Sequence, residues 1–333
     1  MISYISEKWN DIELPTAVEN KVFAEDVFVG LSSSPRFLSS KYFYDKRGDE
    51  LFQKIMKLDE YYPTRCEYEV LNNNKRRLFQ LFSSEGTCFD MVEFGAGDGM
   101  KTKVLLEEFL KLEGNFVYFP IDISNNVLDL LRNDLDMEFP ELKVNALHGD
   151  YFEMLEALNK VDKNKKVVLF LGSNIGNFPN HRANIFLSKL HNNLNLGDML
   201  LIGFDLKKTP EVILSAYNDK NGITRDFNLN LLNRINNELG GNFNLEKFMH
   251  YPIYNPQIGE AQSYLVSKEN QVVHIEAFDT SFEFIAWETI HTEISKKYDL
   301  PQVEKMARNN GFKVVEHLFD KRGWYLNSVW EVI

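Results

Sequence analysis

Short apolar runs alternate with segments of helical periodicity through the central part of the chain. Uninterrupted apolar runs are typical of strands buried on both faces of a parallel sheet, and the segments between them repeat at the spacing of an amphipathic helix. Strands are expected at 88–94, 115–122, 142–150, 165–172 and 198–205, and helices at 101–113, 126–134 and 180–193. This order predicts an α/β protein with a largely parallel sheet.

The end of the chain breaks this alternation. A helix is expected at 301–310, and it is followed by strand-like runs that begin at Gly311 and Trp324. The link between the two runs is too short for a crossover helix, so the strands must pair antiparallel. A parallel sheet that ends in an antiparallel hairpin resembles the Rossmann-like sheet of class I methyltransferases, whereas a Rossmann dehydrogenase does not need the hairpin.

Residues 206–296 interrupt the sheet-forming part of the chain. A helix is expected at 210–217, and a second helix should end before Gly240. Strand-like residues follow, and the runs 263–267 and 271–275 are expected to pair as a hairpin around a short turn. The segment therefore reads as an α+β insertion.

Residues 1–69 are expected to be mainly helical, and the segment 41–65 mixes aromatic side chains with charges and turn residues. This mixture is typical of a binding surface, although the same aromatic side chains would also serve to pack one domain against another. Because 1–69 and 206–296 are each short for a stable core, we expect them to form one substrate-binding domain. The segments 70–205 and 297–333 are then expected to form the cofactor-binding sheet domain.

Composition narrows the range of functions. With 333 residues, 44% of them hydrophobic and 26% charged, the chain is expected to be an ordinary globular protein. Its net charge of −12 argues against nucleic acid as a partner. No apolar run has the length of a membrane span, and residues 1–20 lack the pattern of a signal peptide, so we expect no membrane partner and a cytoplasmic location. A monomer is the separate working expectation. The two cysteines, Cys66 and Cys88, cannot make a structural zinc site, and no metal is expected.

A glycine-rich turn follows the first strand of the sheet and precedes a helix. Its sequence, Glu93-Phe-Gly-Ala-Gly-Asp-Gly-Met100, has Met100 where a dinucleotide fingerprint requires glycine. Carboxylates at Glu93 and Asp98 would also repel a pyrophosphate. A cationic nucleoside without phosphate, S-adenosylmethionine (SAM), fits better, although a glycine turn after a strand can also be no more than a turn.

Three further positions follow strands at the same predicted edge of the sheet. Asp122 ends the second strand, where a carboxylate commonly binds ribose hydroxyls, and Asp150 ends the third, from which it would reach the adenine amino group. Gly172 begins a second glycine-bearing loop after the fourth. Either aspartate would alternatively be a helix cap or a turn residue.

Several blocks give the chain, over nearly its whole length, a resemblance to a known family. The family is that of the histidine-specific N-α-methyltransferases of ergothioneine biosynthesis, which use SAM. The blocks are Tyr42-Phe-Tyr-Asp with Glu60-Tyr-Tyr-Pro-Thr-Arg65; Glu93-Phe-Gly-Ala-Gly with Lys101-Thr102; Phe170-Leu-Gly-Ser-Asn-Ile-Gly-Asn177; Ala216-Tyr-Asn-Asp with Gly222-Ile-Thr-Arg-Asp-Phe-Asn228; and Thr292-Glu-Ile-Ser295.

This resemblance implies that the α-amino group of L-histidine accepts the methyl group, up to three times. It also implies roles for individual residues. Gly95, Lys101, Asp122 and Asp150 would bind SAM. Asn177 and Tyr217 would hold the amino and carboxylate ends of the amino acid, Tyr44, Tyr61 and Thr224 would complete its cage, and Glu293 and Ser295 would contact the imidazole. Two strand residues that are two apart face the same side, which agrees with that last pair.

The proton that leaves the amine is expected to pass, through water, to Tyr44 as the catalytic base. Ser263 stands where the family usually has a methionine, so the chain departs from the pattern at the wall of the amino-acid pocket. A related enzyme acting on another aromatic amino acid, such as a tryptophan derivative, is therefore the alternative. Two other classes remain: a SAM-binding protein without catalysis, and an NAD-dependent oxidoreductase, which Met100 and the C-terminal hairpin oppose.

Overall fold

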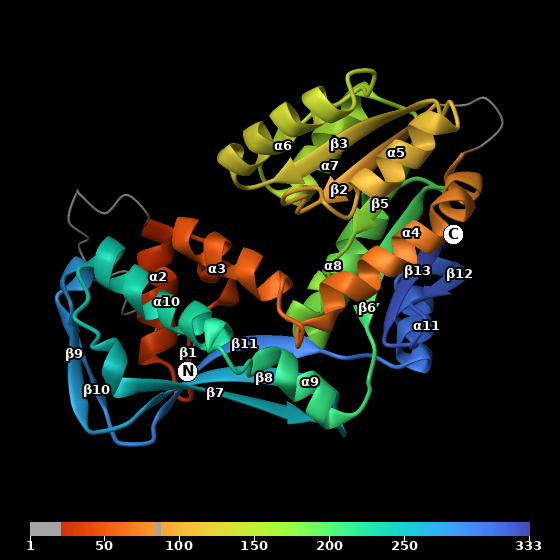
Figure 1. Ribbon diagram of the computed structural model, residues 1–333. Helices are drawn as coiled ribbons and strands as arrows, with labels where there is room; N and C mark the ends of the chain where they lie inside the picture. The colour runs from red at the N-terminus through yellow and green to blue at the C-terminus, as the bar shows by residue number, and fades with distance from the viewer. Residues whose placement is uncertain (1–20, 84–87) are drawn as a thin grey trace. The chain divides into compact units, whose positions relative to one another are not determined.

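The computed structural model describes residues 21–83 and 88–333, and the chain divides into two compact units (Figure 1). The unit that we call the insertion unit runs up to Tyr62 and takes in Lys208–Ser295, and the sheet unit consists of Pro63–Lys207 and Lys296–Ile333. The first boundary lies before the predicted position 69 because one continuous helix, α4, spans Tyr62–Phe82. Residues 1–20 of the predicted substrate domain lie outside the described residues, and its substrate-binding role stays a prediction.

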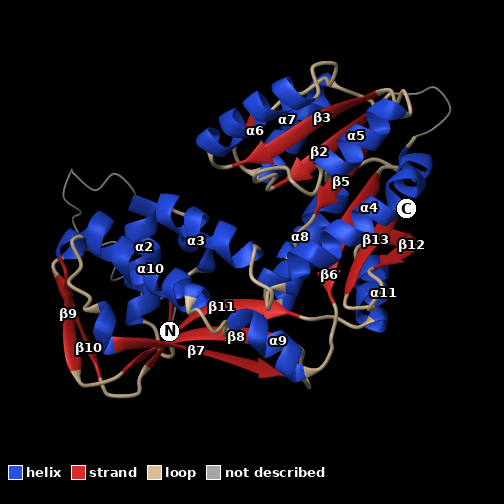
Figure 2. Cartoon of the chain, in the orientation of Figure 1, coloured by secondary structure: helices blue, strands red, loops and turns tan. Residues whose placement is uncertain are grey.

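The sheet unit is built on a seven-stranded sheet in the order β12-β13-β6-β5-β2-β3-β4 (Figure 2). The strands from β6 to β4 are parallel, while β13 pairs antiparallel with both β6 and β12, which confirms the predicted hairpin. The strands are β2 (Phe89–Phe94), β3 (Phe116–Asp122), β4 (Leu147–His148), β5 (Lys165–Phe170), β6 (Met199–Asp205), β12 (Phe312–Phe319) and β13 (Tyr325–Val332).

Helices cover both faces of this sheet. Along β2, Met91 packs into one apolar cluster and Val92 into the other, as expected when successive side chains of a strand point to opposite faces. The cluster around Met91 includes side chains of α4, α5 and α6, and that around Val92 includes side chains of α7, α8 and α11. The bounds are α5 Lys103–Lys111, α6 Asn125–Glu138, α7 Tyr151–Val161, α8 Asn180–Asn192 and α11 Leu300–Asn309.

Two predicted elements of this unit have the wrong length. The strand expected at 142–150 is only β4, with one isolated bridge from Val144 to Tyr118, because polar side chains interrupt its apolar positions at the edge of the sheet. The helix expected at 126–134 continues to Glu138, because its buried side chains keep the helical spacing as far as Leu135. Neither difference moves the ends of β2, β3 and β5: β2 ends before Gly95, β3 ends at Asp122 and β5 ends before Gly172. Asp150, however, comes two residues after the short β4 and does not end a strand.

The insertion unit contains a four-stranded sheet, in the order β1-β11-β8-β7, and a separate pair of strands, β9 and β10. The predicted hairpin between 263–267 and 271–275 is therefore wrong. The first run belongs to β8, which has β7 on one side and β11 on the other, so neither edge is open to β9. The strands are β1 (Arg36–Phe37), β7 (Phe248–Asn255), β8 (Glu260–Ser267), β9 (Gln271–Ile275), β10 (Thr280–Phe284) and β11 (Thr289–Lys296).

One apolar core joins the early segment of this unit to the later one. The Phe43 ring packs against that of Phe227 of α10, with 4.6 Å between their centroids, and the Asp45 carboxylate accepts a hydrogen bond from Asn230 at 2.8 Å. Gly240, with φ +65°, ends α10 in the left-handed conformation that favours glycine. The helices are α2 (Lys21–Ser32), α3 (Lys46–Met56), α9 (Pro210–Tyr217) and α10 (Ile223–Leu239), with 3₁₀ turns η1 (Ser40–Phe43), η3 (Leu245–Lys247) and η4 (Glu276–Phe278).

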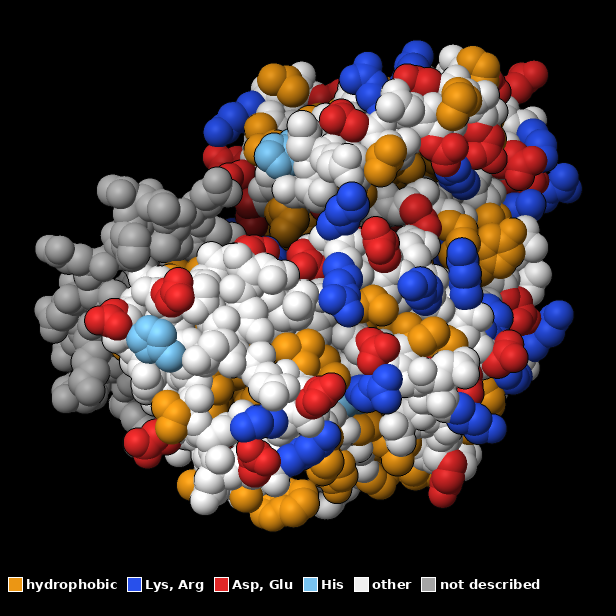
Figure 3. All heavy atoms as spheres, turned by 60° about the vertical axis from the view of Figure 1, so that its left-hand side comes forward, with side chains coloured by type: hydrophobic (Ala, Val, Ile, Leu, Met, Phe, Trp, Pro, Cys, Tyr) orange, Lys and Arg blue, Asp and Glu red, His pale blue; other side chains and the backbone are white. Residues whose placement is uncertain are grey.

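Charges of both signs are distributed over the surface. On the face drawn in Figure 3, lysine and arginine side chains lie among aspartates and glutamates and do not form a continuous basic area. Within 21–83 and 88–333, no helix combines the length and the apolarity needed to cross a bilayer.

Candidate active site

The first glycine loop connects β2 to α5 at the carboxyl end of the sheet. Gly95, Gly97 and Gly99 have φ of +70°, +55° and +66°, in the left-handed region. A Cβ at Gly95 would lie 2.8 Å from the Tyr151 hydroxyl, whereas a Cβ at Gly97 would meet nothing within 4 Å. The loop thus needs glycine for its conformation, and at Gly97 its backbone borders open space that a ligand can approach.

Glu93 places a buried carboxylate beneath this loop. Its side chain, at the end of β2, is only 3% exposed. Thr102 donates a hydrogen bond of 2.6 Å to it, and the Tyr118 hydroxyl donates another. Burial raises the pKa of Glu93 to about 7, against the opposing effect of these hydrogen bonds and of the Lys101 charge. Near neutral pH the group is therefore poised between its neutral and its anionic form.

Asp122 lies at the end of β3, next to the first glycine loop. Its carboxylate accepts a hydrogen bond from the Ser124 backbone at 2.9 Å. Burial raises the pKa of Asp122, and backbone hydrogen bonds from Ser124, Gly97 and Ile123 oppose that rise. The Gly95 amide in turn donates to the Ile121 carbonyl at 2.9 Å. The structure thus brings the predicted ribose ligand and the glycine loop together.

Asp150 has a second role that the sequence left open. It is the N-cap of α7, and its Oδ1 atom accepts hydrogen bonds from the backbone of Phe152 at 2.9 Å and of Glu153 at 3.3 Å. The side chain is exposed, close to β4 at the edge of the sheet. Its contact with adenine stays a prediction.

The second glycine loop follows β5. Gly172 and Ser173 both have left-handed backbones, with φ of +76° and +56°, and the Ser173 hydroxyl accepts a hydrogen bond from the Asp205 backbone at 2.9 Å. A Cβ at Gly172 would lie 3.4 Å from the Lys101 Nζ atom, so the two loops meet here. A small cavity borders both loops and is lined by Glu93, Gly95, Ala96, Asp98, Gly99, Met100, Lys101, Thr102, Leu171 and Asn174.

The sequence analysis missed Glu67, which joins these loops. This residue of α4 is fully buried, and its carboxylate contacts the Lys101 ammonium at 2.5 Å and the Gly172 backbone amide at 2.8 Å. In the sequence it lies two residues after the block that ends at Arg65, which was the one available signal. A glutamate in a helix is usually solvated, so pattern alone does not identify it as buried.

Asn177 is the only predicted amino-acid ligand in the sheet unit. It ends η2 (Asn174–Asn177) in the second glycine loop and is partly buried. The other predicted ligands, Tyr44, Tyr61, Tyr217, Thr224, Glu293 and Ser295, belong to the insertion unit.

Tyr44 and Tyr61 flank one aromatic cluster of the insertion unit. The Tyr44 ring lies 5.6 Å from the ring of Phe52 and 5.9 Å from that of Phe227, both edge-on, and Tyr61 contacts Phe52 at 6.3 Å. Tyr44 is 47% exposed, although its ring packs against this cluster. The inner rings of the aromatic segment thus belong to the core of the insertion unit, and Tyr44 is partly exposed beside them. The predicted binding role of the segment stays a prediction.

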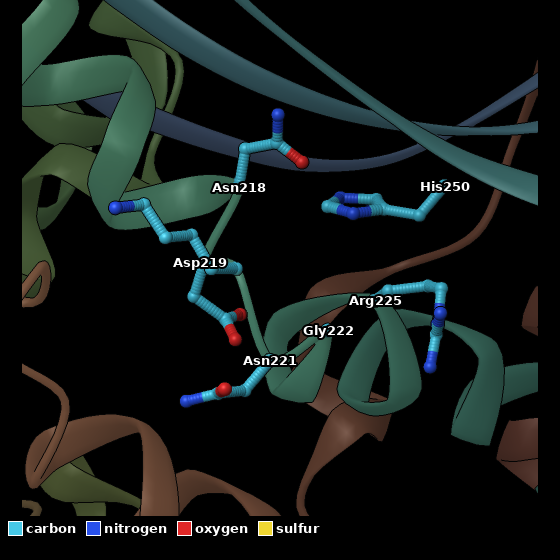
Figure 4. Close-up of a pocket in the computed structure, with 7 residues that line it drawn as sticks. Asn218, Asp219, Asn221, Gly222, Arg225 and His250 are labelled. Atoms are coloured by element: carbon cyan, nitrogen blue, oxygen red, sulfur yellow. The ribbon is translucent and has the colours of Figure 1, made fainter.

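Tyr217 and Thr224 lie at the two ends of the turn between α9 and α10, and both are buried. Asp219 fixes the turn, because its carboxylate accepts hydrogen bonds from the backbone of Ile223 at 3.0 Å and of Thr224 at 2.8 Å. The same turn borders a polar cavity of about 200 Å³, toward which His250 points from β7 (Figure 4). The cavity is lined by Asn218, Asp219, Lys220, Asn221, Gly222, Arg225 and His250.

Glu293 and Ser295 both lie on β11, the first partly buried and the second 6% exposed. The hydroxyl of Ser263, on β8, donates a hydrogen bond of 3.3 Å to the Glu293 carboxylate. Ser263 is itself 1% exposed. The position at which this chain departs from the family pattern is therefore in direct contact with the predicted imidazole ligand, a relation that the sequence did not reveal.

The sheet unit offers the groups that SAM requires. Glycine backbones border open space, the carboxylate of Glu93 suits the positive charges of the cofactor, and that of Asp122 suits its ribose hydroxyls. This combination, on a parallel sheet closed by an antiparallel hairpin, defines a Rossmann-like class I methyltransferase that depends on SAM.

The chain belongs to a particular family of that class. A sequence model described as histidine-specific methyltransferase, SAM-dependent, matches residues 23–332. The chain is 36% identical to the histidine N-alpha-methyltransferase of Mycolicibacterium smegmatis, over 82% of this chain and 83% of the relative. It is 29% identical to ergothioneine biosynthesis protein 1 of Schizosaccharomyces pombe, over 84% of this chain and 36% of that protein. The L-tryptophan methyltransferase of Psilocybe serbica is 26% identical, over 90% of each chain.

Proposed function

We propose that this enzyme methylates the α-amino group of L-histidine, in up to three successive transfers. The observation that carries the proposal is the Glu293 carboxylate, partly buried on β11 and held by Ser263 at 3.3 Å. A carboxylate accepts the N–H of an imidazole, and the Ser295 hydroxyl can donate to or accept from the other ring nitrogen. The mycobacterial and yeast relatives support the same substrate.

The cofactor would be held at the carboxyl edge of the seven-stranded sheet. Bound SAM supplies an electrophilic methyl group on a sulfonium. Asp122 would accept hydrogen bonds from the ribose hydroxyls, and Asp150 would reach the adenine. Gly95 and Gly172 would let the backbone approach SAM closely. Lys101, which lies between the two glycine loops, would also bind SAM.

The amino acid would be oriented mainly by residues around the turn from α9 to α10. Tyr217 and Asn177 would bind its carboxylate and amino ends, while Thr224, with Tyr44 and Tyr61, would complete the cage. Holding the amine in line with the methyl group is the main catalytic task, because near-attack orientation removes the entropic cost of bringing two reactants together.

Each transfer also requires a neutral amine, because an ammonium has no lone pair. We assign the removal of that proton to Tyr44, through water, since its exposed position lets solvent reach the phenol. A trimethylated amine carries a fixed positive charge and no N–H. The ring faces of Tyr44 and its neighbours would then bind it by cation–π attraction.

Ser263 bears on the alternative, a tryptophan-derived substrate. A small side chain in place of methionine would be expected to widen the pocket, but the Ser263 hydroxyl is bonded to Glu293. Histidine and a tryptophan derivative both carry a ring N–H that the carboxylate can accept, whereas an aliphatic amino acid has none, at a cost of about 1–3 kcal/mol. Only the imidazole offers a second ring nitrogen to the Ser295 hydroxyl, and this contact favours histidine.

The test is a competition assay in which the enzyme meets SAM and equal amounts of histidine and tryptophan, with products identified by mass. We expect wild-type enzyme to add methyl groups to histidine. Glu293→Ala should lower kcat/KM for histidine by at least about tenfold and relax the discrimination against tryptophan. Glu283→Ala is the matched control, since Glu283 is exposed on β10, and it should keep the wild-type preference. If Glu293→Ala also keeps that preference, the role of Glu293 in recognising the imidazole is wrong. A wild-type enzyme that does not methylate histidine would overturn the substrate assignment itself.

A further inference from the structure

Glu67 is a buried carboxylate at which four segments of the sheet unit converge. From α4 it contacts Lys101 at 2.5 Å, before the start of α5, and the amide of Gly172 at 2.8 Å, after β5. Asn327 of β13 donates to its other oxygen at 3.1 Å. Gly203 of β6 leaves room for it, because a Cβ there would lie 2.4 Å from the Glu67 carboxylate.

Burying the charge of Glu67 costs free energy, so we look for a role beyond packing. A buried ion pair gives no more stability than apolar side chains of similar volume, because both ions lose their hydration. Here the partners of the carboxylate are Lys101 and the left-handed backbone at Gly172, and both belong to the loops that border the cofactor cavity. Ser173, the next residue, has a left-handed backbone without being glycine, and such a conformation persists only when its surroundings hold it.

We propose that Glu67 is a positioning residue for cofactor binding, which acts by holding the Lys101 ammonium against the second glycine loop. The inference rests on the proposed cofactor site at the two loops. Glu67 also balances the positive charge of Lys101, so that the ammonium does not stand uncompensated beside a cationic cofactor. Glu67 would contact neither the methyl group nor the amine, and so its effect should appear in cofactor affinity.

The decisive variant is Glu67→Gln, because the amide retains an oxygen for the Gly172 N–H and loses the charge paired with Lys101. Calorimetric titration with S-adenosylhomocysteine should show its Kd raised by about tenfold or more. The KM for SAM should rise in parallel, with kcat at saturating SAM within about threefold of wild type. Glu108→Gln is the matched control: Glu108 of α5 is also buried and paired with a cation, Arg76 at 2.7 Å, but its ionic partners belong to α4 and not to the glycine loops. It should leave the Kd within about twofold of wild type.

A second pair of variants separates positioning from mere stability. Lys101→Met removes the cation, and in that background Glu67→Gln should add little further loss of affinity, because the two residues act as one unit. Losses that multiply independently would overturn the proposal. So would an unchanged Kd in Glu67→Gln, whatever its melting temperature.

The same titrations distinguish this inference from the proposed function. A wild-type enzyme that binds S-adenosylhomocysteine but does not methylate histidine would overturn the substrate assignment and leave the role of Glu67 intact. A wild-type enzyme that methylates histidine, together with a Glu67→Gln variant that binds S-adenosylhomocysteine equally well, would overturn the role of Glu67 alone. Failure of the wild-type chain to bind S-adenosylhomocysteine would overturn both.

Discussion

The affinity for SAM should depend on pH through Glu93. Burial raises the pKa of this carboxyl to about 7, so that a large share of the protein carries it in neutral form at pH 6. A cationic cofactor favours the anionic form. If binding requires the carboxylate, the apparent Kd is the intrinsic Kd divided by the ionised fraction, and it should fall by about eightfold between pH 6 and pH 7.5.

Calorimetric titration of wild-type enzyme and Glu93→Gln with SAM, at constant ionic strength, measures this effect. The α-amino group of the cofactor itself titrates at about 7.7–8.0, and the variant corrects for it because both proteins share that contribution. We expect the ratio of the two Kd values to change with pH by about eightfold. A ratio that is constant over the range, or one that changes in the opposite direction, would refute the placement of the cofactor's charge beside Glu93.

Three further predictions concern other parts of the molecule. Asp122→Ala should weaken SAM binding by about ten- to a hundredfold, through the loss of hydrogen bonds to a charged acceptor; unchanged affinity by calorimetry would contradict the ribose assignment. Burial lowers the pKa of His250 to about 4, and the Asp219 charge opposes this with a smaller effect. In the unfolded chain the pKa is about 6.5, so the free energy of unfolding that the neutral imidazole contributes is present above pH 6.5 and is lost as pH falls toward 4. Urea unfolding at pH 7 and pH 5 should therefore show that the free energy of unfolding falls by about 2 kcal/mol less in His250→Asn than in wild type. Equal losses in the two proteins would contradict this role of His250. Residues 206–296 expressed alone should not fold, which dispersed NMR signals from that fragment would disprove.

The sequence predicted those parts of the structure in which local pattern and global fold agree. The apolar runs that form β2, β3 and β5, and the short link before β13, leave few alternatives for a sheet, so the fold class and the edge that bears Gly95 and Asp122 were predictable. The pairing of β8 was not predictable from the local pattern, because one of its two partners, β11, is made more than twenty residues later and competes successfully with the nearer β9.

Single polar contacts were the least predictable. The bond from Ser263 to Glu293 joins two strands, and the role of Glu67 depends on four segments that meet only in the folded sheet unit. In a sequence, each of these residues has the same appearance as a solvated surface residue. Asp150 shows the converse. An aspartate after a strand commonly caps the next helix, and the structure shows that role for Asp150.

The division of the insertion unit between two distant stretches of chain has a consequence during synthesis. The contact between Asp45 and Asn230 joins residues 185 positions apart, and the ring of Phe43 likewise packs against a ring of α10. At about 5–20 residues per second, the ribosome adds the second stretch on the order of 10–40 s after the first. During that interval the apolar side chains of α2 and η1 have left the ribosome without the core that later covers them. Newly made chains should therefore rely on chaperones most strongly before α10 emerges, when the sheet unit is already partly made.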